Sequence, residues 1–228
     1  MDFETGEVIL INKPLRWTSF DVVAKIRGAL RVKKVGHAGT LDPLATGLLI
    51  LCTGKKTKEI ELYQGQEKEY TGTFRLGVTT ESYDLERPVN ATFPVEHISE
   101  AAIYDTTKQF TGKITQFPPP HSAVKIDGKR AYKMARKGQE VPVKEREVEV
   151  SAFEITAIHF PVVSFRIVCS KGTYIRSLAH DFGKALHSGA CLESLVRTRI
   201  GNITLENAME LPAFIAQYGK PKTIEQTP

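Results

Sequence analysis

The sequence predicts an α+β fold, and three observations carry that prediction. Strand patterns alternate with helix patterns along the 228 residues. They do so without the regular β-α-β order of a doubly wound sheet. Residues 146–159 and 163–169 both alternate apolar with polar residues, which indicates an antiparallel pair of strands.

The first third of the chain contains four expected elements. In order, they are a strand at 8–11, a helix at 19–30, and strands at 48–52 and 69–77. The helix places Val23, Ile26 and Leu30 on one face. The strand at 48–52 is apolar throughout, which is typical of an inner strand. Gly77 ends the strand at 69–77.

The rest of the chain adds a helix at 98–110, strands at 146–159 and 163–169, and a helix at 173–187. Prolines at 118–120 forbid regular structure there, so the segment that follows them looks like an insertion. The alternation in 146–159 changes parity, which predicts a bulge near Ala152. In the last helix, Arg176, His180 and Lys184 share a face apart from the apolar one.

Composition places the protein among ordinary globular chains, with 41% hydrophobic and 25% charged residues. One large domain, or one domain with an insertion, is expected. The three cysteines are far apart, which favours a reducing compartment and no disulfide framework. Because neither a signal peptide nor a membrane span is recognisable, a cytoplasmic location without membrane association is expected.

The net charge of +5 is concentrated in one segment. Residues 121–146 carry eight Lys or Arg against three Asp or Glu. A polyanion-binding element is the favoured interpretation of this segment. A solvated lysine-rich face is the alternative, because charge runs are common on protein surfaces and Glu147 and Glu149 follow directly.

Several familiar chemistries do not match. The stretch GLLILCTGKKT has six residues between its glycines and a second lysine where a phosphate loop needs Ser or Thr. The six histidines show no metal-ligand spacing. A G-x-S-x-G nucleophile elbow is also absent from the sequence.

The remaining candidate is Asp42, the one carboxylate of GHAGTLDPLATGLLIL at 36–51. An Asp before Pro is more often a cap or turn residue than a reagent. The glycines Gly36, Gly39 and Gly47 are expected to let the backbone approach a bulky ligand closely. On residue types alone, both roles of Asp42 stay open.

The chain closely resembles the TruB family, the bacterial tRNA pseudouridine synthases that modify the T-loop uridine. The motifs that carry the resemblance run in order from about Ile11 to Arg199; they are INKPLRWTSFDVV, GHAGTLDPLATGLLIL, KEYTGTFRLG, SAVKIDGKRAYKMARKG and CSKGTYIRSLAHDFG. The resemblance implies the pseudouridine-synthase catalytic fold, a mixed and mainly antiparallel sheet flanked by helices. It implies neither a metal nor a cofactor.

The same resemblance makes Asp42 the catalytic carboxylate. Arg176 aligns with the arginine that pairs with it, and otherwise would be a surface helix arginine. Tyr70 aligns with the aromatic that stacks on the target uracil, and otherwise would be a half-buried strand tyrosine. Tyr174 aligns with a second active-site tyrosine. Pseudouridine formation needs an ionised carboxylate that either attacks C1′ or takes a proton from C2′, and both routes stay open.

An RNA-binding set is also implied. His37 aligns with the histidine that fills the space left by the extruded base, although a lone histidine after glycine is usually incidental. Lys13 and Pro14 match a motif that supports the catalytic loop, and Leu195 matches an apolar contact to the uracil pocket. The basic residues expected to contact RNA are Lys125, Lys129, Arg130 and Lys133.

The expected organisation is a catalytic domain over 1–215, with a basic insertion at about 118–146, and a tail at 216–228 without the RNA-binding PUA domain of many relatives. Two positions depart from the family pattern: Arg87 replaces a glycine and His121 replaces a tyrosine. The expected partner is the T-arm of tRNA, bound by a monomer without an obligatory protein partner. The alternatives are a non-catalytic RNA-binding or RNA-folding protein, and a synthase with another RNA target.

Overall fold

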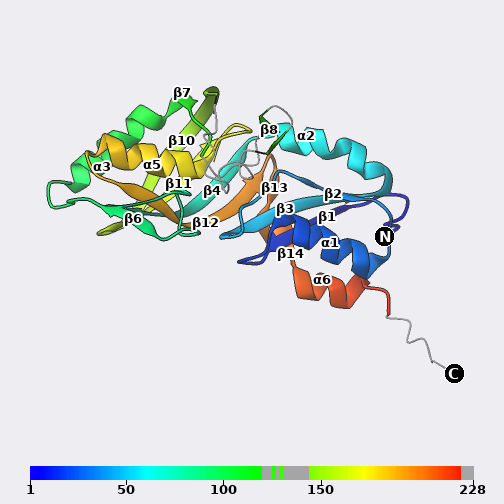
Figure 1. The fold of residues 1–228 in the computed structure, drawn as a ribbon. Coiled ribbons are helices and arrows are strands. Elements are labelled where there is room, and N and C mark those ends of the chain that lie inside the picture. The colour runs from blue at the N-terminus through cyan, green and yellow to red at the C-terminus, as the bar shows by residue number, and fades with distance from the viewer. Residues whose placement is uncertain (120–124, 127–128, 131–143, 222–228) are drawn as a thin grey trace. The chain divides into compact units, whose positions relative to one another are not determined.

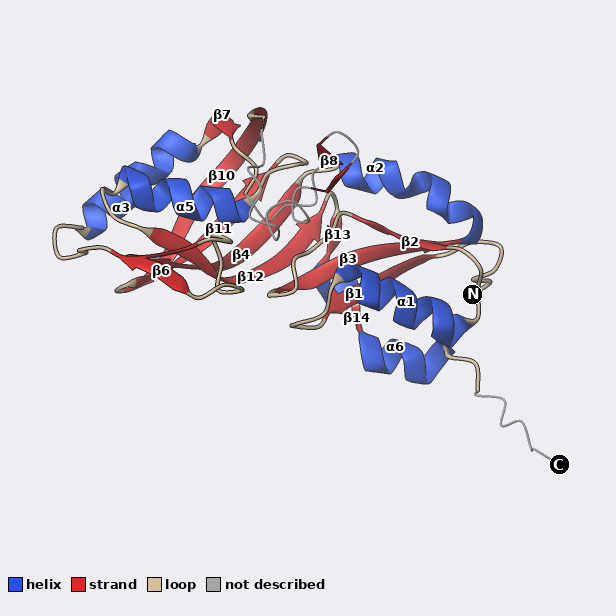
Figure 2. Ribbon diagram, viewed as in Figure 1, coloured by secondary structure: helices blue, strands red, loops and turns tan. Residues whose placement is uncertain are grey.

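The computed structural model describes residues 1–119, 125–126, 129–130 and 144–221 (Figures 1 and 2). The chain divides into two compact units. Unit 1 comprises Met1–Gln66 and Arg197–Pro228, and unit 2 comprises Glu67–Val196. Among the described residues, no helix is long and apolar enough to cross a membrane.

Unit 1 is built on three neighbouring strands. Its elements are β1 (Val8–Lys13), α1 (Ser19–Leu30), β2 (Val35–Ala38), β3 (Ala45–Thr53), the 3₁₀ helix η1 (Gly54–Glu59), α2 (Ile60–Gly65), β13 (Ile203–Thr204), η3 (Leu205–Asn207), β14 (Met209–Glu210) and α6 (Leu211–Tyr218). The strand order is β14-β1-β3, and β2 also pairs with β3. Strand β1 is antiparallel to β3 and parallel to β14.

Strand β3 is buried on both faces, which explains its continuous apolar sequence. Leu49 and Leu51 belong to one core cluster with residues of α1 and α6. Leu48 and Ile50 belong to a second cluster, against which Ile60 at the start of α2 packs. Strand β3, which follows the candidate catalytic loop, therefore lies between two apolar layers.

Unit 2 is a mainly antiparallel sheet. Its elements are β4 (Lys68–Leu76), β5 (Val78–Thr80), β6 (Val89–Thr92), α3 (Glu100–Thr107), η2 (Lys108–Phe110), β7 (Gly112–Gln116), β8 (Lys125–Ile126), β9 (Lys129–Arg130), β10 (Arg146–His159), β11 (Val162–Cys169), α5 (Ile175–Ala185) and β12 (Ala190–Ile200), whose last residues belong to unit 1. The strand order is β12-β4-β11-β10-β7. Neighbouring strands from β4 to β7 in that order are antiparallel.

Aromatic side chains join the sheet of unit 2 to helix α5. The ring of Phe74 on β4 lies 4.3 Å from that of Phe165 on β11 and 5.7 Å from that of Phe182 on α5, centroid to centroid. Phe153 on β10 also lies 5.5 Å from Phe182. Three strands therefore hold α5 through one aromatic cluster, which fixes the helix that carries Arg176.

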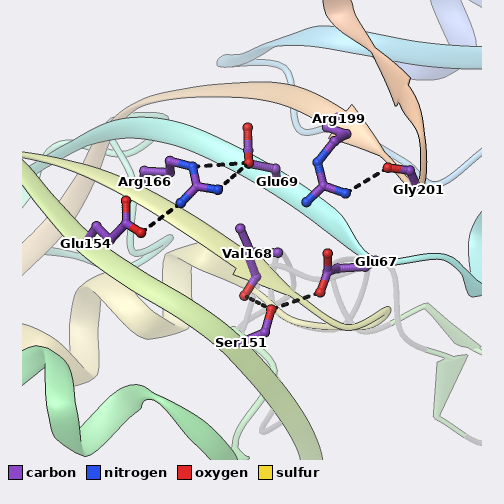
Figure 3. Close-up of polar contacts among 8 residues, drawn as sticks. All are labelled: Glu67, Glu69, Ser151, Glu154, Arg166, Val168, Arg199 and Gly201. Carbon is purple, nitrogen blue, oxygen red and sulfur yellow. Dashed lines mark hydrogen bonds and ion pairs between the residues drawn. The ribbon is translucent and has the colours of Figure 1, made fainter.

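The exposed face of this sheet carries a charged cross-strand network (Figure 3). The guanidinium of Arg166 on β11 donates to Glu69 on β4 at 2.8 Å and to Glu154 on β10 at 2.9 Å. On the edge of the same face, the Ser151 hydroxyl donates to Glu67 at 2.9 Å. Opposite charges on adjacent strands favour this register.

The structure confirms the α+β class and has a helix or strand at each of the eight positions where the sequence predicts one. Strand β10 has the bulge expected near Ala152, but its register shifts a second time between Ile155 and Ala157. The sequence reasoning also missed other elements, which include β2, α2, β5, β6, β7, β12, β13, β14 and α6. The division into a domain over 1–215 and a tail stays a prediction.

The expected role of two glycines was wrong. A Cβ on Gly47 would lie 2.4 Å from the backbone oxygen of Arg197, and one on Gly36 would lie 2.5 Å from the Ile60 side chain. Both positions face the interior of unit 1 rather than a ligand. Gly47 also has a φ of 102°, which side-chain-bearing residues rarely adopt. These glycines therefore serve packing under the candidate loop.

Gly47→Ala should lower the free energy of unfolding by ~1–3 kcal/mol or more, because the new methyl overlaps the β12 backbone. Gly28→Ala is the matched control. Gly28 lies inside α1 with nothing within 4 Å of its Cβ position, so alanine should stabilise by ~0.5–1 kcal/mol. Urea unfolding of both variants measures the difference, and equal effects would contradict this packing role.

Candidate active site

Asp42 lies in a six-residue loop, 39–44, between β2 and β3. The loop is shorter than the turn expected from the sequence, because residues 35–38 and 45–53 are strands. The loop begins at Gly39, whose φ of 84° is easily adopted only by glycine. The Ala45 amide donates to the Asp42 carbonyl at 3.1 Å, which closes the loop onto β3. Asp42 itself is half-buried.

The first residue of α1 holds the middle of this loop. The Ser19 hydroxyl accepts from the Leu41 amide at 2.9 Å and donates to the Leu41 carbonyl at 3.2 Å. Ser19 is fully buried, and its position is set by the Thr18–Asp21 capping box that starts the helix. Both backbone groups of Leu41, the residue before Asp42, are therefore hydrogen-bonded to Ser19.

Two buried cations hold the ends of the loop. The Arg197 guanidinium donates to the Gly39 carbonyl at 3.0 Å and to the Leu48 carbonyl at 2.8 Å. The Lys13 ammonium donates to the Trp17 carbonyl at 2.5 Å, to the Pro14 carbonyl at 2.9 Å and, more weakly, to the Pro43 carbonyl at 3.5 Å. Both cations thereby act on backbone on either side of Asp42.

The Pro43 carbonyl has a second donor, the Arg16 amide at 2.7 Å. Arg16 has a positive φ of 66°, an uncommon conformation for a residue with a side chain. Every residue from Gly39 to Pro43 except Thr40 therefore has a backbone group in a described hydrogen bond. Such a loop can present the Asp42 carboxylate without reorganising.

Burial lowers the pKa of Lys13 to about 8, and the Asp42 carboxylate opposes that effect in part. The side chain is 0% exposed, so it supports the loop from inside rather than from the surface. This placement matches the loop-supporting motif and does not show a contact to RNA.

His37 precedes the loop at the end of β2. Its Nε2 lies 2.9 Å from the Thr40 hydroxyl, and its ring packs edge-on against Phe20 of α1 at 5.1 Å. Burial, followed by the Arg197 guanidinium, lowers the pKa of His37 below its usual range. The expected role of His37 in replacing an extruded base stays a prediction.

Arg176 lies in unit 2, at the second residue of α5, and it is not a surface residue. The side chain is 5% exposed and its Nη1 donates to the Ser82 carbonyl at 3.0 Å. Its Nε lies 3.7 Å from the carboxylate of Asp84, which is equally buried. The Asp84 carboxylate also accepts from the Glu86 amide at 3.0 Å. Arg176 is thus held by the turn that precedes Glu86.

The other candidates of unit 2 lie near α5 or in its sheet. Tyr70 is buried on β4 opposite Ile167 of β11. Tyr174 precedes α5, exchanges two backbone hydrogen bonds with the Gln116 side chain, and carries the Arg146 guanidinium 5.0 Å above its ring. Leu195 is buried on β12. Asp42 belongs to unit 1, so its pairing with Arg176 stays a prediction.

The basic segment is described only in part. Lys125–Ile126 and Lys129–Arg130 form the two-residue antiparallel strands β8 and β9, with Lys125 opposite Arg130. Lys133 and His121 lie outside the described residues. The contact of this segment with RNA stays a prediction. Arg87, the other departure from the family pattern, is exposed on the turn after Asp84.

Sequence reasoning missed Asp84, Ser19 and Arg197 as parts of the site. Ser19 lies in the motif INKPLRWTSFDVV, and Asp84 and Arg197 lie between Ile11 and Arg199, but residue type gave no signal. Serine at a helix start usually serves as a cap. Asp84 and Arg197 look like surface charges until their burial is known.

Asp84→Ala should lower the free energy of unfolding by ~3–5 kcal/mol, because it takes one partner from a buried ion pair. Asp105→Ala is the matched control in the same unit. Asp105 pairs with Lys108 on the surface, where the two side chains are 71% and 78% exposed, so its loss should cost less than about 1 kcal/mol. Chemical unfolding at pH 7 compares the two, and a small effect at Asp84 would contradict the account of this pair.

Lys13 should make folding more favourable as pH rises from about 8 toward its ordinary pKa of 10.5. Over this range the unfolded chain keeps a proton that the folded chain has released, so the unfolded state binds more protons. The unfolding free energy of the unmodified protein minus that of Lys13→Met should therefore become more positive as pH rises. Urea unfolding of both at several pH values under reducing conditions tests this. Cysteine titrations cancel in the difference, and a constant difference would count against it.

Residues 27–175 match the family model described as "TruB family pseudouridylate synthase (N terminal domain)". The chain is 54% identical over 220 residues to the protein named tRNA pseudouridine synthase B of Flavobacterium johnsoniae, covering 93% of this chain and 96% of that one. The protein of the same name from Bacteroides fragilis is 51% identical over 231 residues, covering 99% of each.

Solved structures agree with this likeness. A crystal structure of a Cbf5-Nop10-Gar1 complex contains a chain that matches with a TM-score of 0.74 and 32% identity. A structure of an H/ACA RNP bound to a substrate RNA matches with a TM-score of 0.71 and 29% identity. Each match covers 95% of this chain but only about half of the solved chain, 55% and 54% respectively. By sequence and by fold, the chain belongs to the TruB family of pseudouridylate synthases.

Proposed function

We propose that this chain converts uridine to pseudouridine in the T-loop of tRNA, with Asp42 as the catalytic carboxylate. The observation that carries the proposal is the loop 39–44, in which buried side chains hold the backbone around Asp42. Relatives that match nearly the whole chain are named tRNA pseudouridine synthase B, which supports tRNA as the substrate.

The reaction is an isomerisation that needs no outside reactant. The bond from uracil N1 to ribose C1′ breaks, the base turns, and C5 bonds to C1′. The hydrogen at C5 leaves as a proton and N1 gains one, so atoms and electrons balance. Asp42 acts either by attacking C1′ or by taking a proton from C2′ to give a glycal, and in both cases it must be ionised and firmly placed.

The other residues follow as parts of the same proposal. The Arg176 guanidinium pairs with the Asp42 carboxylate and keeps it ionised and aimed. Tyr70 stacks on the target uracil, with Tyr174 and Leu195 beside it. His37 takes the place of the extruded base, because C1′ and C5 are hidden while the base is stacked. Lys13 supports the loop that carries Asp42.

RNA binding is assigned to the basic segment. Lys125, Lys129, Arg130 and Lys133 would neutralise phosphates of the T-arm, a contact that weakens as salt rises. We propose that the chain acts in the cytoplasm as a monomer and needs no protein partner. The solved chains of the archaeal and related proteins were found in complexes with other proteins, and those partners belong to those proteins.

Asp42→Asn should abolish most turnover while RNA affinity and folding are kept. Asparagine keeps the size and turn-forming capacity of aspartate but cannot supply a carboxylate. A loss of at least ~10²-fold is expected, the lower limit for removing a catalytic acid or base. Tritium release from a T-arm hairpin labelled at uracil C5 measures turnover, because C5 must lose its hydrogen.

The matched control is Asp105→Asn, an exposed carboxylate on α3, which should behave as the unmodified protein. Filter binding of the same hairpin and a thermal melt of each variant separate chemistry from binding and folding. Undiminished tritium release by folded Asp42→Asn would overturn the proposed mechanism and would favour a non-catalytic RNA-binding role.

A further inference from the structure

Tyr83 lies at the centre of the turn that holds Arg176, in a conformation that is rare for a tyrosine. Its φ of 63° is in the left-handed region, where a side chain crowds the backbone. Non-glycine residues in such conformations persist only where surrounding interactions determine them, and they cluster at functional sites. The interactions that hold Tyr83 are therefore informative.

The backbone of this turn is closed by hydrogen bonds on both sides of Tyr83. The Tyr83 amide donates to the Thr80 carbonyl at 3.3 Å. The hydroxyls of Thr80 and Ser82 both donate to the Asp84 carbonyl, at 2.6 and 3.1 Å. The Leu192 amide donates to the Tyr83 carbonyl at 2.9 Å, which joins the turn to β12.

The side chain of Tyr83 joins the same turn to helix α5. Its ring stacks on the His180 imidazole with 3.9 Å between centroids and only 7° between planes. His180 lies four residues after Arg176, one turn further along the helix. Burial, with a smaller effect of Lys184, lowers the pKa of His180 to about 4, so the stack contains a neutral imidazole at pH 7.

The turn and the helix therefore meet at two successive levels. At one level, the Arg176 guanidinium contacts the Ser82 carbonyl and the Asp84 carboxylate. At the other level, the Tyr83 ring lies on His180. The residues that hold Arg176 are the immediate neighbours of Tyr83 on either side, so a shift of the turn at Tyr83 would move both contacts at once.

We propose that the Tyr83–His180 stack is a positioning element that holds the 80–84 turn against α5 and so fixes the orientation of the Arg176 guanidinium. The inference rests on the proposed role of Arg176 toward Asp42. In this proposal both rings act through Arg176, and neither ring contacts the reacting atoms. A displacement of about 1 Å in a positioning group can lower a rate 10²-fold, so the loss of the stack should appear in kcat.

The test separates the ring from the backbone conformation. Tyr83→Phe keeps the stack and should keep kcat within about twofold. Tyr83→Gly removes the ring yet suits the positive φ, and Tyr83→Ala removes the ring at an unsuitable φ. Both should lower kcat at least tenfold in the tritium-release assay, with KM and RNA affinity little changed. If the ring served stability alone, its removal would lower the melting temperature and would not lower kcat selectively over KM.

His180 gives an independent pair of variants, which keeps the test valid if a Tyr83 variant fails to fold. His180→Phe retains a flat ring for the stack and should keep kcat, whereas His180→Ala should lose it. Phe110→Ala is the matched control, because it removes another aromatic contact to α5, 6.2 Å from Phe182. It should lower the melting temperature and leave kcat unchanged.

The outcomes distinguish this inference from the proposed function. If Arg176→Lys loses turnover while Tyr83→Gly and His180→Ala keep it, the positioning role is overturned and the role of Arg176 stands. If Arg176→Lys keeps full turnover, the proposed role of Arg176 fails, and this inference fails with it. Equal losses in Tyr83→Phe and Tyr83→Gly would also overturn the stack, since the phenol rather than the ring contact would then matter.

Discussion

Hydrogen bonds from buried cations to loop carbonyls are the constraint on which the rest of the site depends. The Arg197 guanidinium and the Lys13 ammonium are removed from water, and a buried charge is tolerated only where polar groups surround it. Here those groups are backbone carbonyls on both sides of Asp42. Moving the loop would leave the cations without these acceptors. Because each buried charge needs its hydrogen bonds, the loop is held in one conformation.

The same principle recurs in unit 2 with a different pairing. Arg176 is as deeply buried as Asp84, and the turn that supplies the carboxylate also supplies the Ser82 carbonyl. A planar guanidinium donates hydrogen bonds in fixed directions, so its acceptors define where it points. Each unit therefore holds one group that the proposed mechanism uses, Asp42 in unit 1 and Arg176 in unit 2.

Packing explains why both groups can be held so firmly. In unit 1, β3 lies between two apolar layers, and the loop that carries Asp42 continues directly into it. In unit 2, Phe182 of α5 contacts Phe74 on β4 and Phe153 on β10, which hold the helix on the sheet. Close-packed interiors transmit small shifts instead of absorbing them, so a substitution such as Gly47→Ala, inside the packed layer, reaches the loop.

The sequence by itself determined the α+β class, eight of the helices and strands, the family, and Asp42 as the candidate carboxylate, because hydrophobic periodicity and long ordered motifs are local signals. It missed several other elements, among them strand β12 and helix α6, and misjudged Gly36 and Gly47, whose neighbours Ile60 and Arg197 are distant in the chain. Only the tertiary structure decided that Arg176, Asp84 and Lys13 are buried and which polar groups they contact. Burial of a charge depends on residues brought together by folding, and no local pattern records it.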